Sequence, residues 1–448
     1  MFKTIRNAWS IPDLRRKILF TILIVVFFRI GSVIPVPFLD MSALNNLMTE
    51  NEVNSGTSAL AYLNTLSGGA FSNATIFAMG VTPYINSSII MQLLTVAIPP
   101  LERMAKEGEA GRKKIATITR YVTVGLGLIQ GFAYWWFLNA STDKSGNHIT
   151  IYREGAGLWF SAIVIILAFT AGTAIMMWFG EQINEHGIGN GISILLFAGI
   201  IARFPRTVYI IGQYWQNALG TGEANTADPA KFVFIILWIV LFLAVVWIIT
   251  FMQDSERRIP IQYAKRVVGR KMYGGQSSHL PIKVALGGVL PIIFASSILS
   301  IPGTINLFIG VKDGFWGSFF NAFTQSSWIY IGLYFILILM FAYFYTTIQY
   351  NPIEMANNLK SNNGTVPGIR PGAPTAEYIK KILSRITLIG ALFLSVIAIL
   401  PLIFCKVTDL TALSLSGTSI IIVVGVALET VKQLESQMMM RHYKGFLD

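Results

Sequence analysis

Ten apolar stretches, each long enough to cross a lipid bilayer, dominate this 448-residue chain. A helix of about 20 residues spans the hydrocarbon core of a bilayer, which is roughly 30 Å thick. The composition agrees, because 54% of the residues are hydrophobic and only 12% are charged. The pattern predicts an all-α polytopic membrane protein with ten transmembrane helices, at 18–37, 75–97, 116–138, 158–180, 188–204, 231–252, 282–303, 328–349, 382–404 and 413–432.

Nine of these stretches contain no Asp, Glu or His. Ion- and proton-coupled transporters keep ionisable groups at membrane depth, where a charge costs roughly 2.5–3.5 kcal/mol on insertion scales. The middle of the spans carries Gly, Pro, Ser, Asn and Thr instead. This pattern favours a passive pathway for something large and chemically varied.

Cysteine and histidine give no sign of a metal or redox site. A single cysteine excludes an internal disulfide and offers no zinc-ligand spacing. All four histidines lie in connections between spans or in the C-terminal tail. We therefore expect no metal and no cofactor. The residues concerned are Cys405, His148, His186, His279 and His442.

The basic residues predict the orientation in the membrane, because Lys and Arg in short loops stay on the cytoplasmic side. With a cytoplasmic N-terminus, 25 of them fall in cytoplasmic segments and 6 in the opposite loops. Both termini are therefore expected in the cytoplasm. For the basic loop at 103–114, a topology signal that contacts lipid headgroups is as good an explanation as a functional role.

The order of the spans predicts two halves. Five spans precede a polar stretch at 205–230 and five follow it, so the second set runs in the opposite sense. Such an inverted repeat places a transport route at the interface between the halves. The expected segments are a cytoplasmic N-terminal segment at 1–17, an N-terminal half at 18–204, an external hinge connection at 205–230, a C-terminal half at 231–436 and a tail at 437–448.

Two cytoplasmic loops, 252–281 and 350–380, are much longer than topology requires. The first interleaves Arg and Lys with β-branched and aromatic residues, and the second places Gly and Pro around Arg370. A positively charged projection docks on RNA phosphates or on an acidic protein face, and the residues do not separate these two partners.

The stretch before the second span is too short to cross the membrane. From Tyr62 to Phe71 a helix would cover about half of the hydrocarbon thickness. Gly68 and Gly69 would also break a helix there. The segment either dips into the membrane and turns back, with protein or a water-filled cavity around it, or lies on the outer surface as an amphipathic loop.

Branched apolar residues sit beside small polar ones at the breaks in four spans. Val81 with Ile85, and Ile192 with Leu196, are pairs four residues apart, so each pair lies on one helix face. A ring of such side chains would make a constriction that excludes water. Ordinary packing with small and hydroxyl-bearing residues explains the same pattern more simply.

Seven stretches together resemble the SecY family of bacterial protein-conducting channels, over essentially the whole chain. In chain order they are FRIGSVIPVP, SGGAFSNATIFAMGVTPYINSSIIMQLL, GEQINEHGIGNGISILLFAG, RRIPIQYAKRVVGRKMYGGQSSHLPIKV, LPIIFASSI, NPIEMANNLK with GIRPG, and GTSIIIVVGVALE. One such string would be weak evidence. Seven in order leave little room for another family.

The resemblance implies two inverted five-helix halves around an hourglass pore, with a lateral gate between the second and seventh spans. Two positions depart from an all-Ile pattern in the pore ring, Val81 and Leu196. The implied pore ring is Val81, Ile85, Ile192, Leu196, Ile293 and Ile422. The implied plug, at about 62–74, contains Tyr62, Leu66, Ser67, Gly68, Gly69, Ala70 and Phe71. The implied polar residues of the gate are Ser87, Gln130 and Ser297.

The resemblance also implies partners and a process. Unfolded secretory polypeptides with signal peptides would cross the bacterial plasma membrane, and membrane segments would leave sideways into the lipid bilayer. The small subunits SecE and SecG would clamp the halves, and the SecA ATPase or the ribosome, including its rRNA, would dock on the long loops. The chain has no GxxxxGK[ST] phosphate loop, so we expect no enzymatic activity. The implied docking residues are Arg257, Arg258, Lys265, Arg266, Arg270, Lys271 and Arg370.

Three other classes of protein are weaker interpretations. A secondary transporter shares the inverted repeat, but it needs carboxylates within the membrane. A membrane-embedded hydrolase needs a buried Ser/His, Asp/Asp or metal-ligand set, which the spans do not offer. A structural scaffold needs neither the long basic loops nor the broken segment at 62–74.

The charge asymmetry yields a direct test of topology. In a Cys405→Ser background, Lys265→Cys and Ser361→Cys should be shielded from an impermeant thiol reagent in intact cells. Gly222→Cys should react, because 205–230 is expected outside. Labelling of Lys265→Cys from outside would overturn the predicted orientation.

Overall fold

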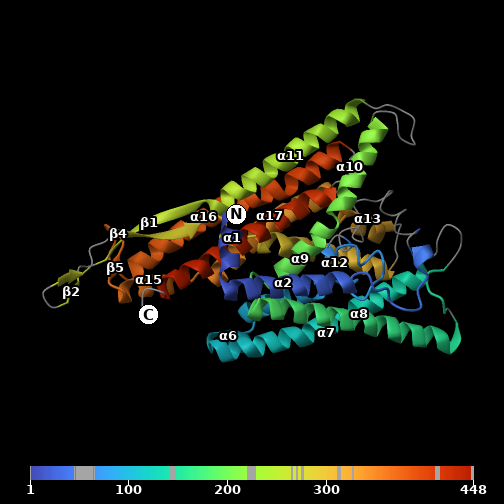
Figure 1. Cartoon of the computed structure of the whole chain (residues 1–448), viewed down its shortest axis with the longest axis horizontal. Coiled ribbons are helices and arrows are strands. Elements are labelled where there is room, and N and C mark those ends of the chain that lie inside the picture. The colour runs from blue at the N-terminus through green and yellow to red at the C-terminus, as the bar shows by residue number, and fades with distance from the viewer. Residues whose placement is uncertain are drawn as a thin grey trace.

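The structure is a computed structural model. It describes the chain apart from residues 1, 45, 47–63, 65, 142–147, 153, 219–228, 264–265, 269–270, 274–276, 310–313, 325–326, 409–413 and 445–448. Long helices run along one common direction, and a small sheet projects beyond them at one end (Figure 1). We call this the sheet end of the molecule.

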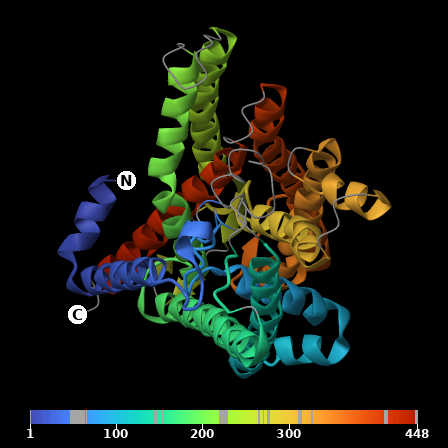
Figure 2. The ribbon, with the colours of Figure 1, turned by 90° about the vertical axis from the view of Figure 1, so that its right-hand side faces the viewer.

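The first half of the chain supplies α1 (Phe2–Ser10), α2 (Pro12–Gly31), α5 (Thr82–Ala97), α6 (Pro99–Lys106), α7 (Glu109–Ala140), α8 (Gly155–His186), α9 (Gly191–Ala202) and α10 (Phe204–Ala218). The second half supplies α11 (Pro229–Asp254), α12 (Leu290–Ile309), α13 (Gly314–Ala322), α14 (Trp328–Gln349), α15 (Pro352–Ser361), α16 (Ala373–Val407) and α17 (Ser414–Lys444). Seen along the helices, most of the first set lies below most of the second, but α10 stands beside α11 at the top and α17 runs down to α1 (Figure 2).

Apolar residues face outward as well as inward, as expected of helices that contact lipid. Only 22% of the most apolar stretch of α11 is buried inside the protein, although its mean hydropathy is 3.3. Leu243 and Trp247 on this helix are among many large exposed apolar side chains. No soluble monomer leaves so continuous an apolar surface uncovered. The chain is therefore a multi-pass membrane protein.

A helix lies over each of the ten expected spans. Within the described residues six helices are long and apolar enough to cross a membrane, and the pair α5 and α6, bent by 99°, makes a seventh. Helices α2, α12 and α17 lie over the remaining three expected spans but do not meet the same test of length and apolarity there.

Two expected helix starts were wrong for local reasons. The second span starts as turns, and its helix begins only at Thr82, after Gly80 with a φ of +56°. The seventh helix begins at Leu290, because Gly288 has a φ of +57° and the preceding Lys283 belongs to a strand. Such positive φ values are open mainly to glycine. The expected connection at 205–230 begins with a helix, α10.

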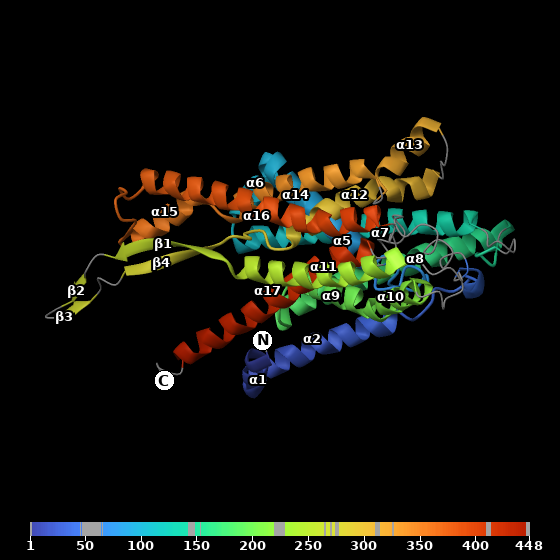
Figure 3. The same cartoon turned by 90° about the horizontal axis from the view of Figure 1, so that it is seen from above.

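The all-helical prediction also missed a sheet. Strands β1 (Glu256–Tyr263), β4 (Ser277–Lys283) and β5 (Gly364–Thr365) pair antiparallel in the order β4-β1-β5. A separate hairpin joins β2 (Arg266–Val268) and β3 (Lys271–Tyr273). Because β5 comes from 350–380, the two expected loops form one body with α15, which we call the sheet module (Figure 3).

A small apolar core attaches the sheet module to α16. Ile259 of β1 and Ile282 of β4 are buried against Ala356 of α15 and Ile379 of α16. Along β1, the buried Ile259 and Ile261 alternate with exposed residues, as in a sheet with one covered face. The module thus packs directly on a membrane helix.

Removing part of that core should loosen the module selectively. Ile259→Ala deletes a fully buried branched side chain, a change that costs about 2–5 kcal/mol in a packed core. We expect faster proteolytic cleavage within 256–283 while the membrane helices stay protected. Gln262→Ala, on the exposed face of the same strand, is the control. Equal cleavage in both variants would show that this core does not hold the module.

Candidate functional site

All six residues of the expected pore ring lie in one hydrophobic cluster at the centre of the protein. Val81, Ile85, Leu196, Ile293 and Ile422 are each at most 4% exposed, and the partly buried Ile192 packs against them. They come from α5 and the residue before it, α9, α12 and α17. The cluster therefore joins elements from both halves of the chain.

A cavity of about 200 Å³ opens on one side of the ring. Ile85, Ile192, Leu196 and Ile293 line its apolar part. On α5, Ser88 and Gln92 lie one and two turns further toward α6, so the cavity extends toward the sheet end. Its polar lining is Ser88, Gln92, Asn190, Ser193 and Tyr345.

Asn190 shapes the wall of this cavity as the cap of α9. Its side-chain oxygen accepts hydrogen bonds from the backbone N–H groups of Ile192 at 3.2 Å and Ser193 at 3.5 Å. An Asn in this position satisfies donors that the first turn of a helix leaves free. The cap fixes Ile192 at the junction between polar wall and apolar ring.

The expected plug packs against the other side of the same cluster. Leu66 and Ala70 are buried members of it. Gly68 between them has a φ of +68°, and a Cβ there would lie 2.9 Å from the Cα and the carbonyl oxygen of Gly199 on α9. Only glycine fits so close a backbone contact. Tyr62 lies outside the described residues.

Hydrogen bonds close the plug segment on itself. The Ser67 hydroxyl donates to the carbonyl of Asn64 and accepts from the backbone N–H of Phe71 at 3.0 Å. The Asn64 side chain accepts from the N–H of Ser72, also at 3.0 Å. Gly69, with a φ of +91°, allows the turn. Polar groups of this irregular backbone are thus satisfied within the protein, as membrane depth demands.

Tyr134 of α7 holds the far end of this segment. Its ring stacks on that of Phe71 with a centroid separation of 4.2 Å, and its hydroxyl donates to the carbonyl of Phe71. Sequence reasoning missed both Tyr134 and Asn64. Tyr134 stands in an ordinary aromatic run, YWWF, and nothing local marks it as a partner of residue 71.

The three expected gate residues do not form one network. The hydroxyls of Ser87 and Thr123 hydrogen-bond to each other, which ties α5 to α7. Ser297 of α12 is fully buried, and within the described residues its hydroxyl has no hydrogen-bond partner. Gln130 is half-buried on the face of α7 that carries Thr123, two turns away. Thr123 is the partner that the sequence analysis missed.

The expected docking residues that the structure describes lie on the sheet module. Arg257 and Arg370 are exposed, and Arg258 pairs with Glu256 through two contacts of 2.7 Å. Pairing of Gln262 with Thr365 joins β1, which carries Arg257 and Arg258, to β5, which precedes Arg370 in the chain. Arg266 and Lys271 are in the β2–β3 hairpin. Lys265 and Arg270 lie outside the described residues.

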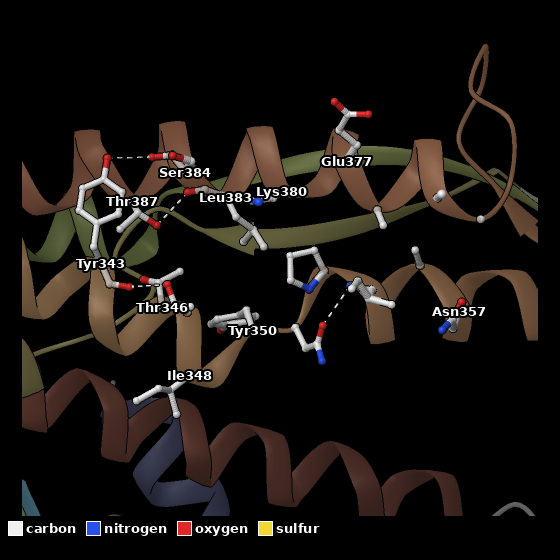
Figure 4. A pocket seen from close by; sticks show the side chains of 18 residues that line it. Tyr343, Thr346, Ile348, Tyr350, Asn357, Glu377, Lys380, Leu383, Ser384 and Thr387 are labelled. Atoms are coloured by element: carbon white, nitrogen blue, oxygen red, sulfur yellow. Dashed lines mark hydrogen bonds between the residues drawn. The ribbon is translucent and has the colours of Figure 1, made fainter. Parts of the chain in front are cut away.

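A larger cavity of about 1070 Å³ separates α14, α15 and α16 (Figure 4). Tyr343 donates to the carbonyl of Ser384 across it at 3.3 Å. Its charged lining residues, Glu377 and Lys380, both come from α16 and lie three residues apart. Among the described residues no group of three His, Cys, Asp or Glu side chains is placed to hold a metal ion.

One ion pair within the helices was also missed. Arg120 of α7 donates to Glu181 of α8 at 2.7 Å, and the Glu181 side chain is only 19% exposed. Arg120 falls inside an expected span, and Glu181 follows the end of another. The pair fixes α7 to α8, next to the bond between Ser87 and Thr123 that fixes α7 to α5.

Comparison with known proteins agrees with this architecture. The SecY family model matches residues 75–431. The protein translocase subunit SecY of Halalkalibacterium halodurans is 45% identical over 451 residues, covering all of both chains. That of Bacillus subtilis is 43% identical over 451 residues, again covering all of both chains.

Solved structures share the fold at low sequence identity. A SecY channel solved in a study of its plug domain has a TM-score of 0.62 and 16% identity, covering 95% of this chain and 92% of that one. Sec61 in a canine ribosome–channel complex has a TM-score of 0.59 and 15% identity, with the same coverage. Fold and site define a polytopic helical membrane protein of the channel type, with an apolar cluster at its centre. The chain belongs to the SecY family.

Proposed function

We propose that this chain is a protein-conducting channel that passes unfolded polypeptides across the bacterial plasma membrane and releases membrane segments sideways. The observation that carries the proposal is the central cluster, in which the ring from both halves and the plug segment pack together. Its relatives are named as protein translocase subunits.

The chemistry of the ring suits a chemically varied substrate. Branched apolar side chains offer no hydrogen bonds to a passing chain, and they expel water when they close on each other. The cavity beside them bears hydroxyl and amide groups, and its lining contains no Asp, Glu, Lys, Arg or His. An ion-coupled transporter, the second candidate, would need such groups there.

The plug segment supports a closed resting state. Its Leu66 and Ala70 complete the cluster on the side away from the cavity. The plug of one structurally similar SecY protein is described as stabilising the closed channel and maintaining a membrane seal. A lateral gate would lie where α12 contacts α5 and α7.

The sheet module supports docking of a partner that supplies energy. We propose the ribosome and the SecA ATPase as its partners, with SecE and SecG clamping the helices. One structural neighbour is a channel in a ribosome complex. This assignment places the sheet end and both termini in the cytoplasm, in keeping with the 25 basic residues of the expected cytoplasmic segments.

Wetting the ring should open the channel to ions. Ile293→Asn or Ile422→Asn places an amide in the constriction and narrows the free-energy gap between closed and open states. A change of about 1.4 kcal/mol raises the open population roughly 10-fold. We expect a matching rise in resting bilayer conductance and export of substrates with defective signal sequences.

The control for that experiment is Ile421→Asn, since Ile421 is buried on the same helix but lies outside the ring. Once corrected for the amount of protein, its resting conductance should not exceed that of the parent channel. If the ring variants are as silent as the parent channel, these side chains serve packing alone and the pore lies elsewhere.

Charge reversal on the module should weaken docking without unfolding the protein. We expect Arg370→Glu and Arg257→Glu to reduce the affinity for SecA or ribosomes, most strongly at low salt, because exposed charges act through screened attraction. Lys360→Glu, another exposed basic residue of the module, is the control for net charge. Unchanged binding together with poor accumulation would mark Arg257 and Arg370 as structural residues.

A further inference from the structure

Arg29 is a charged residue inside the apolar part of α2, at 18–31. It stands in the last turn of α2, between Phe28 and Ile30, and its side chain is half-buried. A guanidinium at this depth is costly and is kept where it has a partner and a role. The structure gives it one hydrogen bond, from Nη1 to the carbonyl oxygen of Gly68 at 3.4 Å.

That carbonyl belongs to a closely packed glycine of the plug. A Cβ at Gly68 would meet Gly199 at 2.9 Å and the Nη1 atom of Arg29 at 3.1 Å. A Cβ at Gly199 would in turn lie 2.9 Å from the carbonyl oxygen of Leu66. Gly68 therefore lies between the backbone of α9 and the side chain of Arg29 on α2.

The plug residues on both sides of Gly68 contribute to the central cluster. Leu66 and Ala70 flank Gly68 and pack into the cluster that contains the ring. When Gly68 leaves the seat, both side chains leave with it, because the Ser67 hydroxyl bonds tie 64–71 into one compact turn. The contact between Arg29 and Gly68 is thus placed to set how firmly the plug closes the channel.

We propose that Arg29 is a positioning residue that holds the plug in its closed seat through the carbonyl of Gly68. The proposal rests on the channel function proposed above. The charged donor favours the seated plug, since a hydrogen bond to a charged group is stronger than one between neutral groups. Arg29 is not one of the ring residues and is expected to leave the path of the polypeptide unchanged.

The test measures resting ion conductance of the reconstituted full chain with its small subunits. Arg29→Gln should raise the leak roughly 10-fold, the factor expected for the loss of one hydrogen bond to a charged group. Arg29→Lys should restore most of the seal, because it keeps a charged donor. Arg385→Gln, which removes an exposed arginine of α16 inside another expected span, is the control and should not leak.

A plug deletion separates positioning from general damage. Deleting 62–74 should itself leak, and adding Arg29→Gln to the deletion should change nothing further, because the arginine acts through the segment that is gone. An additional leak in the deleted background would contradict the proposal. If the deletion leaks ions and Arg29→Gln does not, the proposal is contradicted as well. A deletion that does not leak would instead count against the channel function.

Gly199→Ala provides a second approach that leaves Arg29 in place. Its added methyl group would press on the carbonyl of Leu66 and lift the plug from the same seat. We expect a leak similar to that of Arg29→Gln, and no added leak when the two changes are combined. Full additivity would show that the two residues act on different structures.

Discussion

The structure depends on one apolar contact, at which four helical elements and a broken segment bring branched side chains together. Burial of these side chains contributes about 25 cal/mol for each Å² removed from water, and a cavity with hydroxyl and amide groups in its lining opens directly beside the ring. The contact is therefore strong when closed and non-directional. Both properties suit a seal that must reform after a polypeptide of any sequence has passed.

Polar contacts around the seal have a different task, which is to fix the surrounding parts. Hydrogen bonds of Thr123 and Glu181 join α7 to its neighbours, and Tyr134 and Arg29 donate to the carbonyls of Phe71 and Gly68 in the expected plug segment. Each of these bonds is directional and pairs groups that lipid would leave unsatisfied. The protein thus combines non-directional apolar contacts at its centre with directional polar contacts around them.

Much of this was predictable from the chain alone, and the failures have physical causes. Long apolar runs predicted the helices, and glycines at 68, 80 and 288 predicted breaks in them. Both features depend on residues that are close together in the sequence. The ring residues became identifiable only through resemblance, since Ile293 looks like any packing residue. Strand β5 and the contact of Tyr134 were not predicted, because their partners lie about 100 and 63 residues away in the chain.

The most direct test of the account places a photo-crosslinking amino acid at single positions and arrests a polypeptide during export. The account predicts that probes at Leu196 and Ile422 capture the arrested chain. A probe at Leu243, which is 61% exposed on the outer face of α11, should capture lipid or nothing. Capture from Leu243 but not from the two ring positions would contradict the claim that the apolar ring encloses the path.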